Sequence, residues 1–231
     1  MKNLKLAAVC LSCLTMTGCS ALNFSVEGLI NAPKLTSEQS EIHQALIESV
    51  GSNITLKYPK NGEYRSAYVI ANIDDEPADE AMVFYEYTSN GSEEDGLRVN
   101  ILDKDEDGKW YSVKELAGAG TDIDQVIISP MGSNNQTDVF VGYQNLTNDE
   151  KTMEIYSYTD GDFKRVALDT YSVLEPLDIN NDGYIELITI QRSTNNDTGA
   201  VTAKASMLNM KNDEITRGEN VDMCDNVTSY V

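Results

Sequence analysis

Residues 178–189 read Asp178-Ile179-Asn180-Asn181-Asp182-Gly183-Tyr184-Ile185-Glu186-Leu187-Ile188-Thr189, an acidic loop that runs into an apolar strand pattern. Oxygen-bearing side chains stand at its first, third, fifth and ninth positions. The stretch 72–83 can be laid over it, and there the same positions hold Asn72, Asp74, Glu76 and Glu80. Between these two, 129–141 has a degraded loop in the corresponding place. The pattern therefore repeats about every 50 residues, which suits a four-stranded β unit.

Short strand patterns separated by turn dipeptides continue in both directions from these loops. They cover 54–58, 66–71, 81–87, 97–102, 126–128, 139–143, 152–158, 163–168, 185–191 and 201–210. Dipeptides such as Asn61-Gly62, Asp107-Gly108 and Asp160-Gly161 tolerate the positive φ of tight hairpins. The sequence predicts a mainly β chain.

One helix is expected, over 37–50, ahead of the strands. Thr36 followed by Gln39 resembles a capping box, apolar residues fall on one face, and Gly51 ends the pattern. We therefore expect a capped helix and first hairpin over 36–65. The β repeats then cover 66–231, in units of about 66–120, 121–172 and 173–231.

The spacing Asp178-x-Asn180-x-Asp182-Gly183-x-x-Glu186-Leu187 resembles the calcium loop of FG-GAP/VCBS repeats. These repeats form the integrin-alpha-type β-propeller blades of many exported bacterial proteins. The resemblance implies about three four-stranded, blade-like units. Because closed propellers typically have at least four blades, it implies a partial or truncated propeller.

Calcium prefers several hard oxygen ligands from a tightly curved loop, with a glycine at the bend. In the later loop, Gly183 could make the bend, and the expected ligands are Asp178, Asn180, Asp182, Glu186 and the backbone carbonyl of Tyr184. An EF-hand would need an acid at position 12, which is Thr189. We therefore expect a structural calcium ion, with a solvated turn as the alternative.

Two other acidic loops fit calcium less well. Asn72, Asp74, Glu76 and Glu80 keep the oxygen spacing, but Pro77 stands where the glycine should be, and proline cannot adopt a positive φ. The run 103–108 begins with alternating Asp residues but has Tyr111 at its ninth position. We predict that it forms a hairpin turn.

The N-terminus is typical of an exported chain. Residues 1–18 have a basic start and an apolar stretch, and Met16-Thr17-Gly18-Cys19 resembles a bacterial lipobox. This resemblance implies a lipoprotein signal peptide over 1–18, lipid on Cys19, a tether over 19–35, and membrane attachment outside the cytoplasm. The alternative is an ordinary secretory signal with an accidental Cys.

Composition narrows the function. The 231 residues hold 17 Lys+Arg against 38 Asp+Glu, for a net charge of -21. Nucleic acid is therefore not an expected partner, since its binding needs clustered basic residues. With a single histidine and no catalytic motif, we expect a non-enzymatic cell-surface protein that binds a protein or a glycan. The alternatives are an exported carbohydrate-active enzyme or its accessory domain, and a structural or non-functional fragment of a longer propeller.

Overall fold

The computed structural model describes residues 35–88, 96–131, 136–145, 150–194, 197–211 and 214–225. The expected signal peptide, Cys19 and most of the tether lie outside the described residues. The chain divides into two units, Met1–Glu38 and Gln39–Val231, and every strand belongs to the second.

The expected helix is present as α3, Ser37–Val50. Its apolar face buries Ile42, Ala45 and Leu46. It ends at Gly51, whose φ is 84° and whose backbone N–H donates to the Ile47 carbonyl at 2.9 Å.

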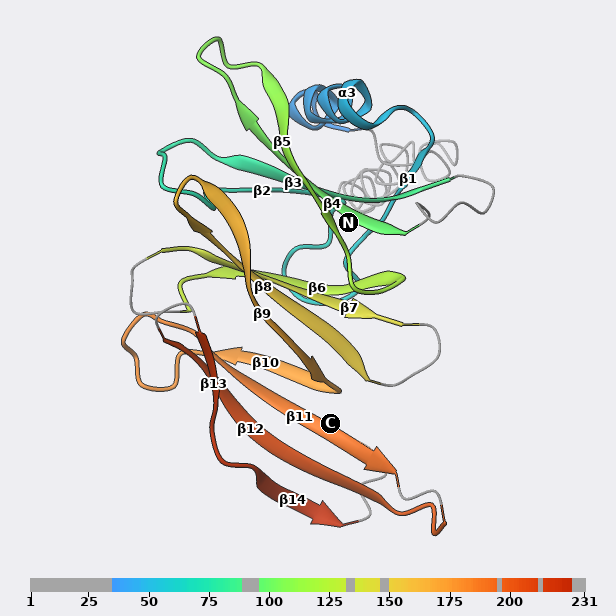
Figure 1. Cartoon of the computed structure of the whole chain (residues 1–231), viewed down its shortest axis with the longest axis vertical. Coiled ribbons are helices and arrows are strands. Elements are labelled where there is room, and N and C mark those ends of the chain that lie inside the picture. Colours follow the sequence, from blue (N-terminus) through green and yellow to red (C-terminus); the bar gives the residue numbers. More distant parts are fainter. Residues whose placement is uncertain are drawn as a thin grey trace, which may run out of the picture. The chain divides into compact units, whose positions relative to one another are not determined.

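The strands form three antiparallel sheets, shown in Figure 1. The first sheet contains β1 Ile54–Leu56, β2 Tyr68–Ala71, β3 Glu80–Tyr87, β4 Leu97–Lys104 and β5 Trp110–Ala117. The second contains β6 Asp122–Ser129, β7 Asp138–Gln144, β8 Lys151–Thr159 and β9 Asp162–Tyr171. The third contains β10 Val173–Leu177, β11 Glu186–Thr194, β12 Val201–Lys211, β13 Glu214–Arg217 and β14 Val221–Asp225. The prediction of a mainly β chain with one helix is confirmed for the described residues.

Each sheet contains four strands that pair in chain order. These are β2-β3-β4-β5, β6-β7-β8-β9 and β10-β11-β12-β13, while β1 adds to β3 and β14 adds to β12. The sequence patterns did not predict β10, which contains Pro176. A proline cannot donate to the ladder, but β10 is an edge strand that pairs only with β11.

The buried clusters follow a regular alternation along the second strand of each four-strand set. In β3, Ala81, Val83 and Tyr85 pack with α3, while Met82 and Phe84 join a cluster with the second sheet. In β7, Val139, Val141 and Tyr143 face the first sheet, while Phe140 packs with the third sheet. In β11, Leu187 faces the second sheet. On these three strands, residues with odd numbers therefore face the preceding helix or sheet. In β3 and β7, residues with even numbers face the following sheet.

The segment between β1 and β2 joins the first sheet to the second. The Lys60 and Asn61 backbone N–H groups donate to the carbonyls of Ile123 and Asp124 at 3.2 and 2.7 Å. The Asn61 side chain also donates to the Asp124 carboxylate at 2.8 Å. This segment therefore pairs with β6 from outside its own sheet.

Candidate cation-binding loops

Three loops occupy the same place in the three sheets, between the first and second strands of the four-strand set. Each ends in a carboxylate at the start of the second strand: Glu80, Asp138 or Glu186, here called the loop carboxylates. Each loop carboxylate accepts a hydrogen bond from the backbone N–H seven residues earlier. The distances are 2.8 Å from Ile73 to Glu80, 3.0 Å from Met131 to Asp138 and 2.9 Å from Ile179 to Glu186. The three loops therefore share one closing contact.

The loop 178–186 is held by its own polar side chains. The Asp178 carboxylate accepts from the backbone N–H groups of Asp182 and Gly183 at 3.1 and 3.0 Å. The Asn180 amide donates to Asp182 at 3.0 Å and to Glu186 at 3.3 Å. The amide thus lies between two carboxylates.

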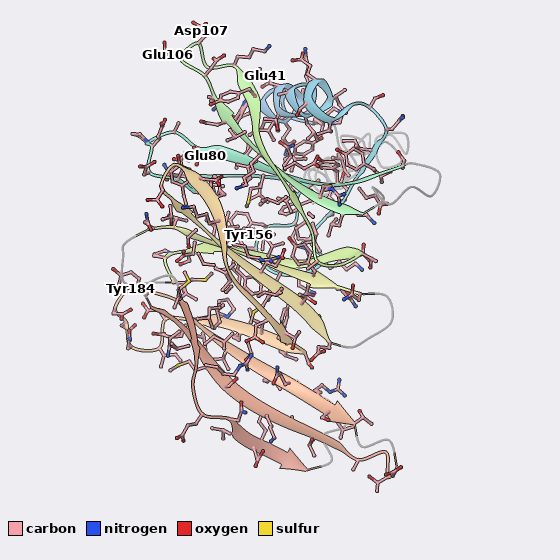
Figure 2. The ribbon with its side chains drawn as sticks, viewed as in Figure 1. Glu41, Glu80, Glu106, Asp107, Tyr156 and Tyr184 are labelled. Carbon is pink, nitrogen blue, oxygen red and sulfur yellow. The ribbon has the colours of Figure 1, made fainter. Side chains whose placement is uncertain are left out.

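The backbone of this loop turns where the sequence placed the bend. Gly183 has a φ of 89° and Asn181 has a φ of 59°, so two residues are left-handed. Tyr184 lines an open pocket of about 330 Å³ together with Asn180, Asp182 and Glu186. Figure 2 labels Tyr184 beside this loop. Of the expected ligand side chains, Asn180, Asp182 and Glu186 lie together, while Asp178 faces backbone N–H groups.

The loop 72–80 closes differently. The Asn72 amide donates to the carbonyls of Glu76 and Ala78 at 2.5 and 3.0 Å, and Asp74 accepts from the Glu76 backbone N–H at 2.7 Å. No residue between 72 and 80, all of them described, has a positive φ. The Asn72 and Asp74 side chains therefore bond the loop backbone, Glu76 takes part through its own backbone groups, and Pro77 is accommodated without the glycine-type bend.

Glu80, labelled in Figure 2, is the most unusual carboxylate of the three loops. It is 1% exposed, and its Oε1 atom has no hydrogen-bond partner in the described chain. The pKa of Glu80 is raised to about 7, chiefly by burial; the nearby charges of Asp74 and Asp103 act in the same direction, and the hydrogen bond from the Ile73 N–H acts against them. Burial also raises the pKa of Asp74, with Asp103 and Asp75 adding to the effect. This corner of the first sheet therefore holds more negative charge than its hydrogen bonds compensate.

In the second sheet, a hydroxyl group compensates the buried loop carboxylate. Asp138 is 0% exposed, but the Ser157 hydroxyl opposite it in β8 donates to its second oxygen. By register, Asp103 lies opposite Glu80, one residue beyond the Ala81–Leu102 pair. Asn209 lies opposite Glu186 by the same count from the Leu187–Leu208 pair. Sequence reasoning missed this opposing position, because only the strand register reveals it.

The run 103–108 forms the β4–β5 hairpin, as predicted. Asp105 accepts from the backbone N–H groups of Asp107 and Lys109 at 3.0 and 2.9 Å, and Gly108 has a φ of 76°. Glu106 and Asp107 lie at the tip of this hairpin (Figure 2). Asp103 is the exception in this run, because its charge acts on the loop 72–80.

Within the described ranges, no three His, Cys, Asp or Glu side chains are grouped closely enough to hold a metal ion. The same part of the chain contains no helix with the length and hydropathy that crossing a bilayer requires. No protein-family model, curated protein or solved structure matches this sequence.

Proposed function

We propose that this chain is a non-enzymatic lipoprotein of the bacterial cell envelope, attached through lipid on Cys19. Its three sheets are propeller-type units that present a surface to a protein or glycan partner. Structural calcium stabilises the loops 72–80 and 178–186, which lead into the second strands of the four-strand sets in the first and third sheets. The observation that carries the proposal is the closing contact shared by Glu80, Asp138 and Glu186, since a loop geometry that recurs in every unit is typical of a repeat scaffold.

The loop 72–80 gives the strongest physical reason for a bound cation. A buried carboxylate oxygen without a partner costs free energy unless it is protonated or binds a cation. Glu80 has such an oxygen, and the negative charges of Asp74 and Asp103 act on it. These three carboxylates would have to move closer together to share an ion. Calcium is the suitable class of ion, because it accepts carboxylate, amide and water oxygens in flexible geometry.

The loop 178–186 is the second calcium site in this proposal. The Asn180 amide NH₂ group between Asp182 and Glu186 takes the place of a cation between two carboxylates. Rotation of that amide would present its oxygen to calcium instead. Asp182 and Glu186 would then bind the ion, together with the Tyr184 carbonyl and water.

Thermal unfolding with calcium or with EDTA tests both sites. At a calcium concentration of about 100 times Kd, binding to the folded chain alone adds about 2.7 kcal/mol, which is roughly 5–10 °C for a chain of this size. Glu80→Gln and Asp182→Asn should each reduce this calcium-dependent shift.

Asp138→Asn is the matched control, because Asp138 occupies the same loop position but is already hydrogen-bonded by Ser157. It should leave the calcium-dependent shift unchanged, whatever it does to the melting temperature itself. A wild-type chain that melts at the same temperature in calcium and EDTA would remove calcium from the proposal.

The anchor and the binding role need separate experiments. Labelled palmitate should enter the wild-type chain and not Cys19→Ala, and equal labelling of the two would refute the anchor. Binding on a glycan array without hydrolysis supports a binding module. Hydrolysis abolished by replacing one carboxylate would instead support a carbohydrate-active enzyme.

A further inference from the structure

A groove of about 310 Å³ lies between α3 and the tip of the β4–β5 hairpin. The residues along it that matter here are Glu41, Ala45 and Glu48 from α3, and Asp107, Lys109 and Trp110 from the hairpin. Figure 2 labels Glu41 on α3 and Asp107 at the tip of the hairpin. None of these residues belongs to the loops proposed above to bind calcium, so the groove is a separate feature of the first sheet.

The floor of the groove is apolar and consists of Ala45 and the exposed edge of Trp110. Both residues belong to the buried cluster that packs α3 on the first sheet, so the core holds the floor in place. On the ring face of Trp110, the Lys104 ammonium nitrogen lies 4.3 Å from the ring centre. The indole therefore already interacts with one alkylammonium group of the chain itself.

Carboxylates stand at both ends of this floor. Glu41 and Glu48 are seven residues apart on α3, so they share one helix face with Ala45 between them and lie about 10 Å apart along the helix axis. At one end, the Lys109 ammonium nitrogen lies 3.7 Å from the Glu48 carboxylate. At the other end, the Glu41 and Asp107 carboxylates form no ion pair with any residue that the structure describes. The groove thus has a negative charge at each end, and only one end is compensated.

A linear molecule with a positive charge at each end and methylene groups between them complements this arrangement. Diamines and linear polyamines are such molecules, because alkylamines are protonated at pH 7. A chain with about nine bonds between its terminal nitrogens spans about 10–11 Å when extended, which matches the separation of Glu41 and Glu48. A lysine side chain of a protein partner has one ammonium group and would compensate only one end. Charge and length together therefore favour the diamine.

We propose that the groove between α3 and the β4–β5 hairpin binds linear diamines and polyamines of this length. One ammonium group pairs with Glu41 and Asp107, and the other displaces Lys109 from Glu48. The methylene chain packs on the apolar floor between them. Because both ion pairs are exposed to solvent, binding is reversible and weakens as salt is added. The proposal depends neither on bound calcium nor on the lipid anchor.

Titration of the full chain with 1,8-diaminooctane in EDTA tests the proposal. Trp110 is the only tryptophan of the chain, so a saturable change in tryptophan fluorescence is expected, and calorimetry measures the same affinity without relying on fluorescence. Octylamine has one ammonium group, and 1,4-diaminobutane is too short to reach both ends. Each lacks one exposed ion pair and should bind up to about fivefold more weakly. Added salt should weaken the binding of 1,8-diaminooctane more than that of octylamine.

Charge variants locate the site. Glu41→Gln and Glu48→Gln should each weaken the binding of 1,8-diaminooctane by about threefold to fivefold. Asp222→Asn removes the same charge from an exposed side chain of the third sheet, and it should leave the affinity nearly unchanged. Lys109→Gln should instead strengthen binding, because no ammonium group of the chain then competes for Glu48. Lys204→Gln is its matched control, since it breaks an exposed ion pair with Asp222 in the third sheet, and it should not strengthen binding to the same degree.

Four outcomes would overturn the proposal. The first is the absence of binding by both fluorescence and calorimetry, and the second is equal affinity for octylamine and 1,8-diaminooctane. The third is an equal loss of affinity in Glu41→Gln and Asp222→Asn, which would indicate attraction to the overall negative charge rather than to the groove. The fourth is binding of N-acetyl-lysine amide as tight as that of the diamine, which would indicate a lysine of a protein partner instead.

Discussion

Gly142 in β7 is the position where adding one methyl group should be most damaging. A Cβ atom built there stands 2.1 Å from the Tyr171 hydroxyl oxygen and 3.2 Å from the Tyr171 Cζ and Phe140 Cε1 atoms. Gly142 does not have a positive φ, so the backbone itself would accept alanine. The expected cost of Gly142→Ala therefore comes from the collision with Tyr171.

The magnitude follows from the packing and the hydrogen bond that Tyr171 would lose if it moved. Its ring is 0% exposed, and its hydroxyl donates to the Asp124 carboxylate at 2.6 Å. Overpacking a close-packed core costs about 1–3 kcal/mol, and losing a hydrogen bond to a buried charged group costs about 1.5–3 kcal/mol. We expect Gly142→Ala to lower the free energy of unfolding by about 1.5–5.5 kcal/mol, after a gain of about 0.5–1 kcal/mol for replacing a strand glycine.

Urea unfolding of a double-mutant cycle measures this. Tyr171→Phe alone should cost only about 1–2 kcal/mol, because Asp124 keeps its contacts to Lys151 and Asn61 at 2.8 Å each. The Tyr171→Phe background lacks the hydroxyl oxygen that the added Cβ atom would meet. There, Gly142→Ala should cost less than about 1.5 kcal/mol. The coupling free energy should be about 2 kcal/mol. If the free-energy costs of the two single variants sum to the cost of the double variant within about 0.5 kcal/mol, the collision between the added methyl group and Tyr171 is refuted.

Three further changes test other parts of the fold. Because burial holds the pKa of Glu80 at about 7 against an ordinary 4.5, the folded chain keeps a proton that the unfolded chain loses, so stability should fall as pH rises from 4.5 to 7. Urea unfolding in EDTA should show that the free energy of unfolding of Glu80→Gln falls by up to about 3 kcal/mol less than that of the wild type over this pH range. Identical pH profiles of the two proteins would contradict this expectation. Gly108→Ala meets no atom within 4 Å but has a φ of 76°, so it should cost about 1–2 kcal/mol, and Gly108→Asn should cost less. Leu46→Ala empties a fully buried site under α3 and should cost about 2–5 kcal/mol in the same assay, whereas a cost below about 1 kcal/mol would show that α3 is not packed as described.

Much of the strand pattern was accessible from sequence because local chemistry determines it. The Asp-Gly turns at 107–108 and 160–161 lie at hairpin tips, since both glycines adopt the positive φ that such turns require. The helix 37–50 followed from its cap, its apolar spacing and Gly51. These features depend on neighbours within a few residues along the chain.

The remaining features depend on contacts between distant residues. Asp103 belongs to a hairpin motif in the sequence, yet its charge acts on Glu80 through strand register. Ser157 closes the loop of the second sheet from nineteen residues away. β10 was missed because Pro176 argues against a strand, and only its edge position makes it acceptable. Sequence spacing gave the candidate ligands but could not show which side chains oppose them.

The segment that carries Lys60 and Asn61 also affects how the molecule opens. It hydrogen-bonds the first sheet to β6 through the backbone, in addition to the shared apolar cluster. The third sheet is joined to the second by its own shared apolar cluster, by side-chain contacts such as Arg217 with Asp169 and Gln191 with Thr170, and by a backbone bond from Ile185 to Pro130. Local unfolding follows the weakest boundary between cooperative units. The Lys60 and Asn61 backbone amides should therefore exchange their hydrogens only when the boundary between the first two sheets opens, and they report that opening separately from the boundary between the second and third sheets.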